Sequence, residues 1–157
     1  MKRIFAFLFI SLYFTTGIAF AENSAEALKF FRNYVNAANS YSNTLVDMYS
    51  PDAKIIRQVI KPDGEPVNIE TDTATYIKQL RLGQKTAKLR RYKNTYSNIK
   101  TEKVPNGYKI SALRQPSGER YKLKSYMIIN KQPNGEWKII EELMQTKVQL
   151  FLKYADK

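Results

Sequence analysis

The stretch PNGYKISALRQPSGERYKLKSYMIINKQPNGEWKII, residues 105–140, contains three Pro-x-Gly segments separated by runs that look like β-strands. Proline presets the first central residue of a tight turn, Asn or Ser suits the second, and glycine takes the left-handed conformation that closes a bulged hairpin. A fourth copy, PDG, lies at residues 62–64. One copy would be weak evidence, but four copies between strand-like runs predict β-hairpins.

The last three turns separate four extended segments that are rich in Tyr, Ile, Thr and Val, as strands are. Because the connections are short, successive strands should run antiparallel in a meander. The first turn closes a smaller hairpin, about residues 54–61 with 67–70. The meander strands are expected at about residues 92–103, 108–115, 119–131 and 136–146.

Three other segments are expected to be helical. Residues 24–41 carry apolar side chains at helical spacing, and residues 43–49 continue as a short helix that Pro51 stops. Thr71 or Asp72 caps a third helix that reaches about residue 91. The tail after residue 146 fits a helix or a strand end, and the sequence does not choose between them. Helices gathered on one face of an antiparallel sheet predict an α+β domain.

The element order resembles that of the nuclear transport factor 2-like (NTF2-like) family, which includes the SnoaL-like and ketosteroid-isomerase-like groups. Three stretches carry the resemblance: LVDMYSPDAKI (45–55), YIKQLRLGQKTAK (76–88) and GEWKIIEEL (135–143). The resemblance spans about residues 25–147 and implies a cone-shaped α+β domain. Three N-terminal helices with a small hairpin would pack on a curved four-stranded antiparallel meander. The family includes enzymes, ligand binders and interaction modules, so the resemblance is specific for fold and poor for function.

The N-terminus has the pattern of an export signal. The chain begins MKR, an apolar run follows at residues 4–14, and Ala-Phe-Ala stands at residues 19–21. This order predicts a signal peptide, residues 1–21, that is cleaved before the remaining single domain, residues 22–157. The alternative is a retained anchor, but the run is shorter than the ~20 apolar residues that a membrane span needs. We expect a periplasmic or secreted protein.

The overall composition limits the chemistry. The chain has 26 Lys and Arg against 14 Asp and Glu, and it has neither cysteine nor histidine. It therefore has no disulfides, no thiol chemistry and no cysteine or histidine metal ligands, and we expect neither a metal site nor a cofactor. The net charge is +12 for the full chain and +10 after the predicted loss of Lys2 and Arg3 (24 − 14). For an exported protein, this charge favours phospholipid headgroups, anionic glycans or acidic proteins over nucleic acid.

Arg57 occupies an unusual position, between Ile55 and Val59 on one face of the first expected strand. In the isomerase branch of the family a catalytic base falls on this strand, shortly after the Asp-Ala that ends the second helix. Matching PDAKIIRQ to that pattern places Arg57 at or beside the position of the base. Arginine cannot act as a base near neutral pH, and the absence of histidine excludes a His–Asp site. The best-known catalytic residues of this fold are therefore missing, which favours a noncatalytic protein.

Three interpretations of Arg57 remain. It can lie at the rim and pair with Glu141 or Glu142 for structure, or it can bind an anion through its planar fork. In the third, a desolvated glutamate with a raised pKa is catalytic. Adjacent strand residues point to opposite faces, so only one of the two glutamates can face the cone.

Tyrosines on the meander can line a pocket and present hydroxyls to a ligand, although most such tyrosines pack in cores. The candidate ligand-binding residues are Arg57, Tyr96, Tyr108, Tyr126, Glu141 and Glu142.

The third expected helix carries a stripe of cations at spacings of three and four residues, and no acid lies among them. A solvated helix face is the simplest explanation. The single sign of charge also favours an anionic partner, either a membrane surface or an acidic protein. The stripe consists of Lys78, Arg81, Lys85, Lys88 and Arg91.

Three functions fit these residues. The first is an exported, noncatalytic module that binds a small, acidic ligand in its cone. The second is a protein–protein interaction module of an envelope or secretion assembly, in which the open sheet face can also form a homodimer. The third is an enzyme with an atypical Arg/Glu/Tyr site. The scarcity of acids and the lack of histidine place the enzyme last.

Overall fold

A computed structural model describes residues 14–154, with side chains described for residues 22–153. Residues 1–13 of the predicted signal peptide lie outside this range, and the first helix begins at Phe14, inside that predicted segment. None of the helices in the described residues is both long and apolar enough to cross a bilayer.

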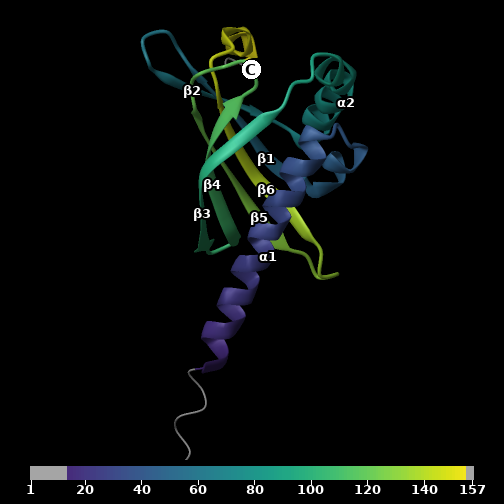
Figure 1. Cartoon of the computed structure of the whole chain (residues 1–157), viewed down its shortest axis with the longest axis vertical. Helices are drawn as coiled ribbons and strands as arrows, with labels where there is room; N and C mark the ends of the chain where they lie inside the picture. Colours follow the sequence, from purple (N-terminus) through teal and green to yellow (C-terminus); the bar gives the residue numbers. More distant parts are fainter. Residues whose placement is uncertain (1–13, 155–157) are drawn as a thin grey trace, which may run out of the picture.

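The described residues form two α-helices, two short 3-10 helices and six strands, with the chain order seen in Figure 1. The elements are α1 (Phe14–Asn39), η1 (Asn43–Met48), β1 (Tyr49–Ile60), β2 (Pro66–Thr71), α2 (Thr73–Leu89), β3 (Asn94–Val104), β4 (Gly107–Pro116), β5 (Leu123–Lys131), β6 (Trp137–Thr146) and η2 (Gln149–Tyr154).

All six strands belong to one mixed sheet in the order β2-β1-β6-β5-β4-β3. Strands β3 to β6 are antiparallel neighbours, as the turns predict, but β1 pairs with β6 in parallel. The prediction of a four-stranded antiparallel meander is therefore wrong, because the β1–β2 hairpin extends the same sheet. Turn residues indicate which strands are consecutive, but they carry no information about the distant pairing of β1 with β6.

The prediction of three N-terminal helices is also wrong. Only α1 and η1 precede the first strand, and α2 lies between β2 and β3. Asp72 is the N-cap of α2, since its carboxylate accepts the Thr75 N–H at 2.8 Å. Within the tail, whose conformation the sequence leaves open, Gln149–Tyr154 form η2.

The glycines of the four Pro-x-Gly segments adopt positive φ, which confirms the predicted turns. Gly107 has the tightest surroundings. Its φ is +141°, and the position that a Cβ would occupy lies against the backbone of Ile129. A Cβ there would collide with the Ile129 carbonyl, so this hairpin requires glycine. The four glycines are Gly64, Gly107, Gly118 and Gly135.

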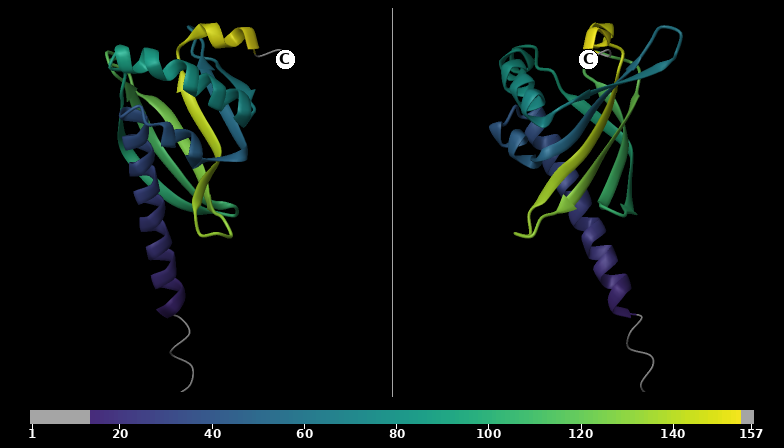
Figure 2. Two further views of the ribbon diagram at one scale, coloured as in Figure 1. Left: turned by 90° about the vertical axis from the view of Figure 1, so that its right-hand side faces the viewer. Right: turned by 180° about the vertical axis from the view of Figure 1, so that it is seen from behind.

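The core lies between α1 and the inner face of the sheet. Phe31 of α1 is 3% exposed and belongs to the same buried cluster as Ile110 and Ile129 of the sheet. Both views of Figure 2 place α2 and η2 at one end of the sheet, while α1 extends beyond the opposite end. The curved sheet and its helices thus form a cone with α2 and η2 at its mouth.

Candidate functional site

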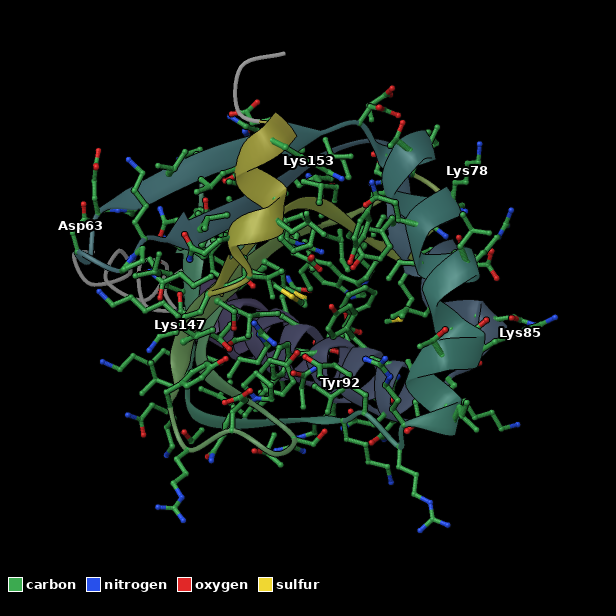
Figure 3. All side chains as sticks on the ribbon, turned by 90° about the horizontal axis from the view of Figure 1, so that it is seen from above. Asp63, Lys78, Lys85, Tyr92, Lys147 and Lys153 are labelled. Atoms are coloured by element: carbon green, nitrogen blue, oxygen red, sulfur yellow. The ribbon has the colours of Figure 1, made fainter. Side chains whose placement is uncertain are left out.

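A cavity of about 450 Å³ opens at the end of the sheet where α2 and η2 lie. Figure 3 looks onto this end, with α2 along one side and η2 on the other. The end of α1, η1 and the nearby ends of β3, β4 and β6 complete its wall. Leu45, Leu80, Met144 and Phe151 supply apolar surface. The volume falls within the range of about 300–1,000 Å³ that is typical of small-molecule sites.

The charges on the wall of the cavity have one sign. Its lining includes Arg57, Arg81 and Arg114 but no aspartate or glutamate. Within the described part of the chain, no group of three or more acidic residues could hold a metal ion. The lining is therefore suited to an anion rather than to a cation.

Glu142 lies just behind this wall and is 1% exposed. Its Oε1 accepts hydrogen bonds from Arg57 at 2.9 Å and from the Tyr76 hydroxyl at 3.4 Å. Its Oε2 accepts from the hydroxyls of Tyr49 at 2.6 Å and Tyr34 at 3.1 Å. Four donors from α1, β1 and α2 thus meet one carboxylate of β6. With both oxygens engaged, Glu142 ties the helices to the sheet.

The tyrosines around Glu142 stay protonated well above neutral pH. Burial raises the pKa of Tyr34 and of Tyr49 well above the ordinary value, and the charge of Glu142 raises both further. Burial also raises the pKa of Tyr76, to about 12, although the charge of Arg57 opposes the shift. These hydroxyls are therefore fixed hydrogen-bond donors rather than acids that act at neutral pH.

Arg57 forms the ion pair that the rim interpretation predicts. On the parallel strands β1 and β6, Ile55 lies opposite Glu142, so Arg57 is a diagonal neighbour of Glu142 on the same face. Desolvation lowers the pKa of Arg57, but Tyr76 and Glu142 outweigh it and the net shift is upward. The guanidinium also lies 4.7 Å from the centre of the Tyr76 ring. Arg57 remains charged, and Glu142 already balances that charge.

The structure separates the other candidate residues. Tyr96 lines the cavity together with Arg57. Tyr126 and Glu141 point to the opposite face of the sheet, where the Tyr126 hydroxyl donates to Glu141 at 2.6 Å. Tyr108 packs edge to face against Trp137, with ring centres 6.0 Å apart. Glu142 is thus the glutamate that faces the cone.

Arg114 is a cavity residue that the sequence analysis did not single out. It is 6% exposed and donates to the Asn94 side chain at 2.8 Å and to the Gln145 carbonyl at 2.7 Å. A signal was present, because Arg114 has the same strand parity as Ile110 and Ala112, which are buried in the core. That alternation could have placed it on the inner face.

Four residues of the predicted cation stripe lie exposed along α2, and none of them forms an ion pair within the described residues. Lys78 and Lys85 lie on the outer side of α2 (Figure 3), and Arg81 lines the cavity. Arg91 is not part of the stripe, because α2 ends at Leu89 and Arg91 has φ of 50°. Leu89 itself is 86% exposed.

The sequence matches no protein-family model and no curated protein sequence. Solved structures share its fold. An NTF2-like protein of unknown function from Pseudomonas putida KT2440 has a TM-score of 0.61 at 9% identity, covering 80% of this chain and 87% of that one. An NTF2-like protein with a cystatin-like fold from Novosphingobium aromaticivorans has a TM-score of 0.61 at 10% identity, covering 86% and 91%. A Catenulispora acidiphila protein in complex with S-DNPA has a TM-score of 0.55 at 9% identity, covering 80% and 93%.

Proposed function

We propose that this chain, which has the NTF2-like fold, is an exported, noncatalytic module that binds a small acidic ligand in its cone. The observation that carries the proposal is the lining of the cavity, which has three arginines and no carboxylate. Arginine offers a planar, permanently charged fork that suits carboxylate or phosphate groups.

The surroundings of Glu142 favour binding over catalysis. A general base must reach the proton that it removes, directly or through one water. Glu142 is 1% exposed, and its oxygens already accept from Arg57 and three tyrosines. The whole sequence contains no histidine that could replace it. These facts argue against the atypical Arg/Glu/Tyr enzyme.

The apolar part of the wall favours a ligand with an apolar portion. Leu45, Leu80 and Met144 face the same cavity as the arginines. Burial of an apolar group against them would contribute about 25 cal/mol for each Å² removed from water. The solved complex of a similar cone with S-DNPA also supports small-molecule binding.

Helix α2 supports a second partner, an anionic membrane surface. Lys78, Leu82, Lys85 and Leu89 follow one another at helical spacing, and the two leucines are 71% and 86% exposed. Basic and apolar residues on one exposed helix face are typical of helices that lie on membranes. Because α2 also walls the cavity, the ligand could enter or leave at the membrane.

The outer face of the sheet supports the alternative function, a protein–protein interaction module or homodimer. By strand alternation Tyr126, Ile128 and Leu143 point away from the face that α1 and α2 cover. A half-buried apolar sheet face can bind a protein of an envelope assembly or a second copy of the chain. Sedimentation of the purified protein across concentrations would reveal such a dimer.

Thermal melts of the purified mature protein against a panel of small molecules test the main proposal. Acidic amphipathic compounds should raise the melting temperature of the wild-type protein. They should not stabilise Ala87→Trp, which fills the cavity, but they should stabilise Ala74→Trp, an exposed change on the same helix. If no acidic compound stabilises the wild-type protein, the binding proposal is wrong.

Export has its own test. When the full chain is expressed in a bacterial host, the protein should appear in the periplasm or the medium. Its mass should be that of residues 22–157, the chain that begins at Glu22. Recovery of the uncleaved chain in the cytoplasmic fraction would contradict the predicted signal peptide.

A further inference from the structure

Arg114 is a buried cation that no carboxylate balances within the described residues. Its side chain lines the cavity, and the residue is 6% exposed. All its acceptors are neutral: the Asn94 side chain at 2.8 Å, the Gln145 carbonyl at 2.7 Å and the Tyr92 hydroxyl at 3.4 Å. Arg57, the other inward arginine of the cavity, differs in that it has a full ion pair with Glu142.

Two polar atoms of the cavity residues also lack partners. The Nε–H of Arg114 and the hydroxyl of Tyr41 are buried without a hydrogen bond to any described residue. Buried polar groups are nearly always paired, and a buried charge without a counter-ion is especially unfavourable. Both residues line the same cavity. The charge of Arg114, which no described carboxylate balances, therefore favours an anion that enters this cavity.

We propose that Arg114 is the binding site for the carboxylate of an amphipathic monoanion. The proposal rests on the function proposed above and names the class of ligand. One negative charge is enough, because Glu142 already balances Arg57 and Arg81 is exposed to solvent. The planar guanidinium matches a carboxylate, and Leu45 and Leu80 offer apolar surface to the rest of the molecule.

Calorimetry with three probes of equal chain length tests this proposal: octanoate, octanamide and octyl phosphate. The wild-type protein should bind octanoate about tenfold or more tightly than octanamide, since a charge-assisted hydrogen bond is stronger than a neutral one. Arg114→Gln should reduce that preference to about one. Lys85→Gln removes an exposed cation of α2 that does not line the cavity and should leave the preference intact.

Folding of the variants is measured separately. If Arg114 serves a ligand rather than the fold, Arg114→Gln without ligand should melt at or above the wild-type temperature, because it removes an unbalanced buried charge. Arg114→Lys keeps the charge without the fork and should bind octanoate with intermediate affinity. A large loss of melting temperature in both variants would assign Arg114 to the fold and overturn the proposal.

The remaining outcomes separate this inference from the function on which it rests. Equal binding of octanoate and octanamide by the wild-type protein would refute the carboxylate site but keep the cavity as a binding site. Unchanged preference in Arg114→Gln would place the anion elsewhere and refute the role of Arg114. Tighter binding of octyl phosphate than of octanoate would refute the carboxylate class. Binding of none of the three probes would refute the amphipathic monoanion as the ligand, and the melts against the panel of acidic compounds would then decide the proposed function separately.

Discussion

Arg57 and Glu142 form a 2.9 Å ion pair between the adjacent parallel strands β1 and β6. The Glu142 carboxylate also accepts hydrogen bonds from tyrosine hydroxyls of both α-helices. The pair therefore belongs to the framework of the cone. Glu142 balances the charge of Arg57. Arg114 is then the inward-facing cation that has no counter-ion among the described residues.

Breaking this pair from one side should destabilise the protein. Arg57→Gln leaves a 1% exposed carboxylate without its counter-ion, and such changes lower the free energy of unfolding by about 3–5 kcal/mol. Glu142→Gln should have a similar effect, because Arg57 is then unpaired. Urea unfolding near neutral pH measures both.

The double variant Arg57→Met/Glu142→Met provides the control. Since it removes both charges, its loss of stability should be smaller than the sum of the two single losses. Additive losses would mean that the two residues act independently, against the account of the framework.

High pH should destabilise the protein through its buried tyrosines. The pKa of Tyr76 is raised to about 12 in the folded protein, against about 10 in an unfolded chain. A raised pKa gives stability that is complete below the unfolded value and disappears as pH rises through the folded value. At about 1.4 kcal/mol per pKa unit, Tyr76 alone accounts for roughly 2 to 3 kcal/mol between pH 10 and 12.

Urea unfolding at pH 8, 10 and 11 measures this decline in the free energy of unfolding. Tyr76→Phe removes the group and should flatten part of the decline. Tyr92→Phe, at a tyrosine that is 40% exposed and does not contact Glu142, is a control outside the buried network. A wild-type stability that does not change above pH 10 would show that the tyrosines are not buried as described.

Gly107 should be far less tolerant of substitution than Gly64. Both have positive φ, but an added Cβ at Gly64 meets no atom within 4 Å, whereas at Gly107 it meets the backbone of Ile129. Gly64→Ala should lower the free energy of unfolding by about 1–2 kcal/mol for the backbone conformation. Gly107→Ala should lower it by on the order of 3 kcal/mol or more, because a clash is added. Equal effects in thermal or urea unfolding would contradict the close approach of β4 to β5.

Co-sedimentation with anionic vesicles tests the membrane surface proposed for α2. Each cation near such a surface contributes about 1 kcal/mol, so Lys78→Gln/Lys85→Gln should weaken binding by roughly thirtyfold. The matched change Lys29→Gln/Lys100→Gln, on α1 and β3, should have little effect. Binding should also fall at high salt. Failure of the wild-type protein to bind at low salt would exclude the membrane.

Local signals in the sequence predicted much of the fold. The Pro-x-Gly turns located four hairpins, and Asp72 located the start of α2, because both signals act within a few residues. The parallel pairing of β1 with β6 joins residues that are far apart in the sequence, such as Arg57 and Glu142. No turn residue indicates this pairing. The NTF2-like resemblance, which the solved structures support, implied the cone without that detail.

The site was less predictable for a related reason. Strand alternation limited the partner of Arg57 to one of two adjacent glutamates, but only the register of β1 on β6 identifies Glu142. Tyr126 looked like Tyr96 in the sequence, yet it points to the other face of the sheet. Arg114 was missed because charged residues on strands usually lie in solvent, although its parity with Ile110 and Ala112 indicated the inner face.

The most direct test of the account is calorimetry of octanoate with the wild-type protein, Ala87→Trp and Ala74→Trp. The account predicts one binding site in the wild-type protein, which persists in Ala74→Trp and is lost in Ala87→Trp because the indole fills the cavity. Retention of wild-type affinity in Ala87→Trp would show that the ligand binds outside the cone and would contradict the account.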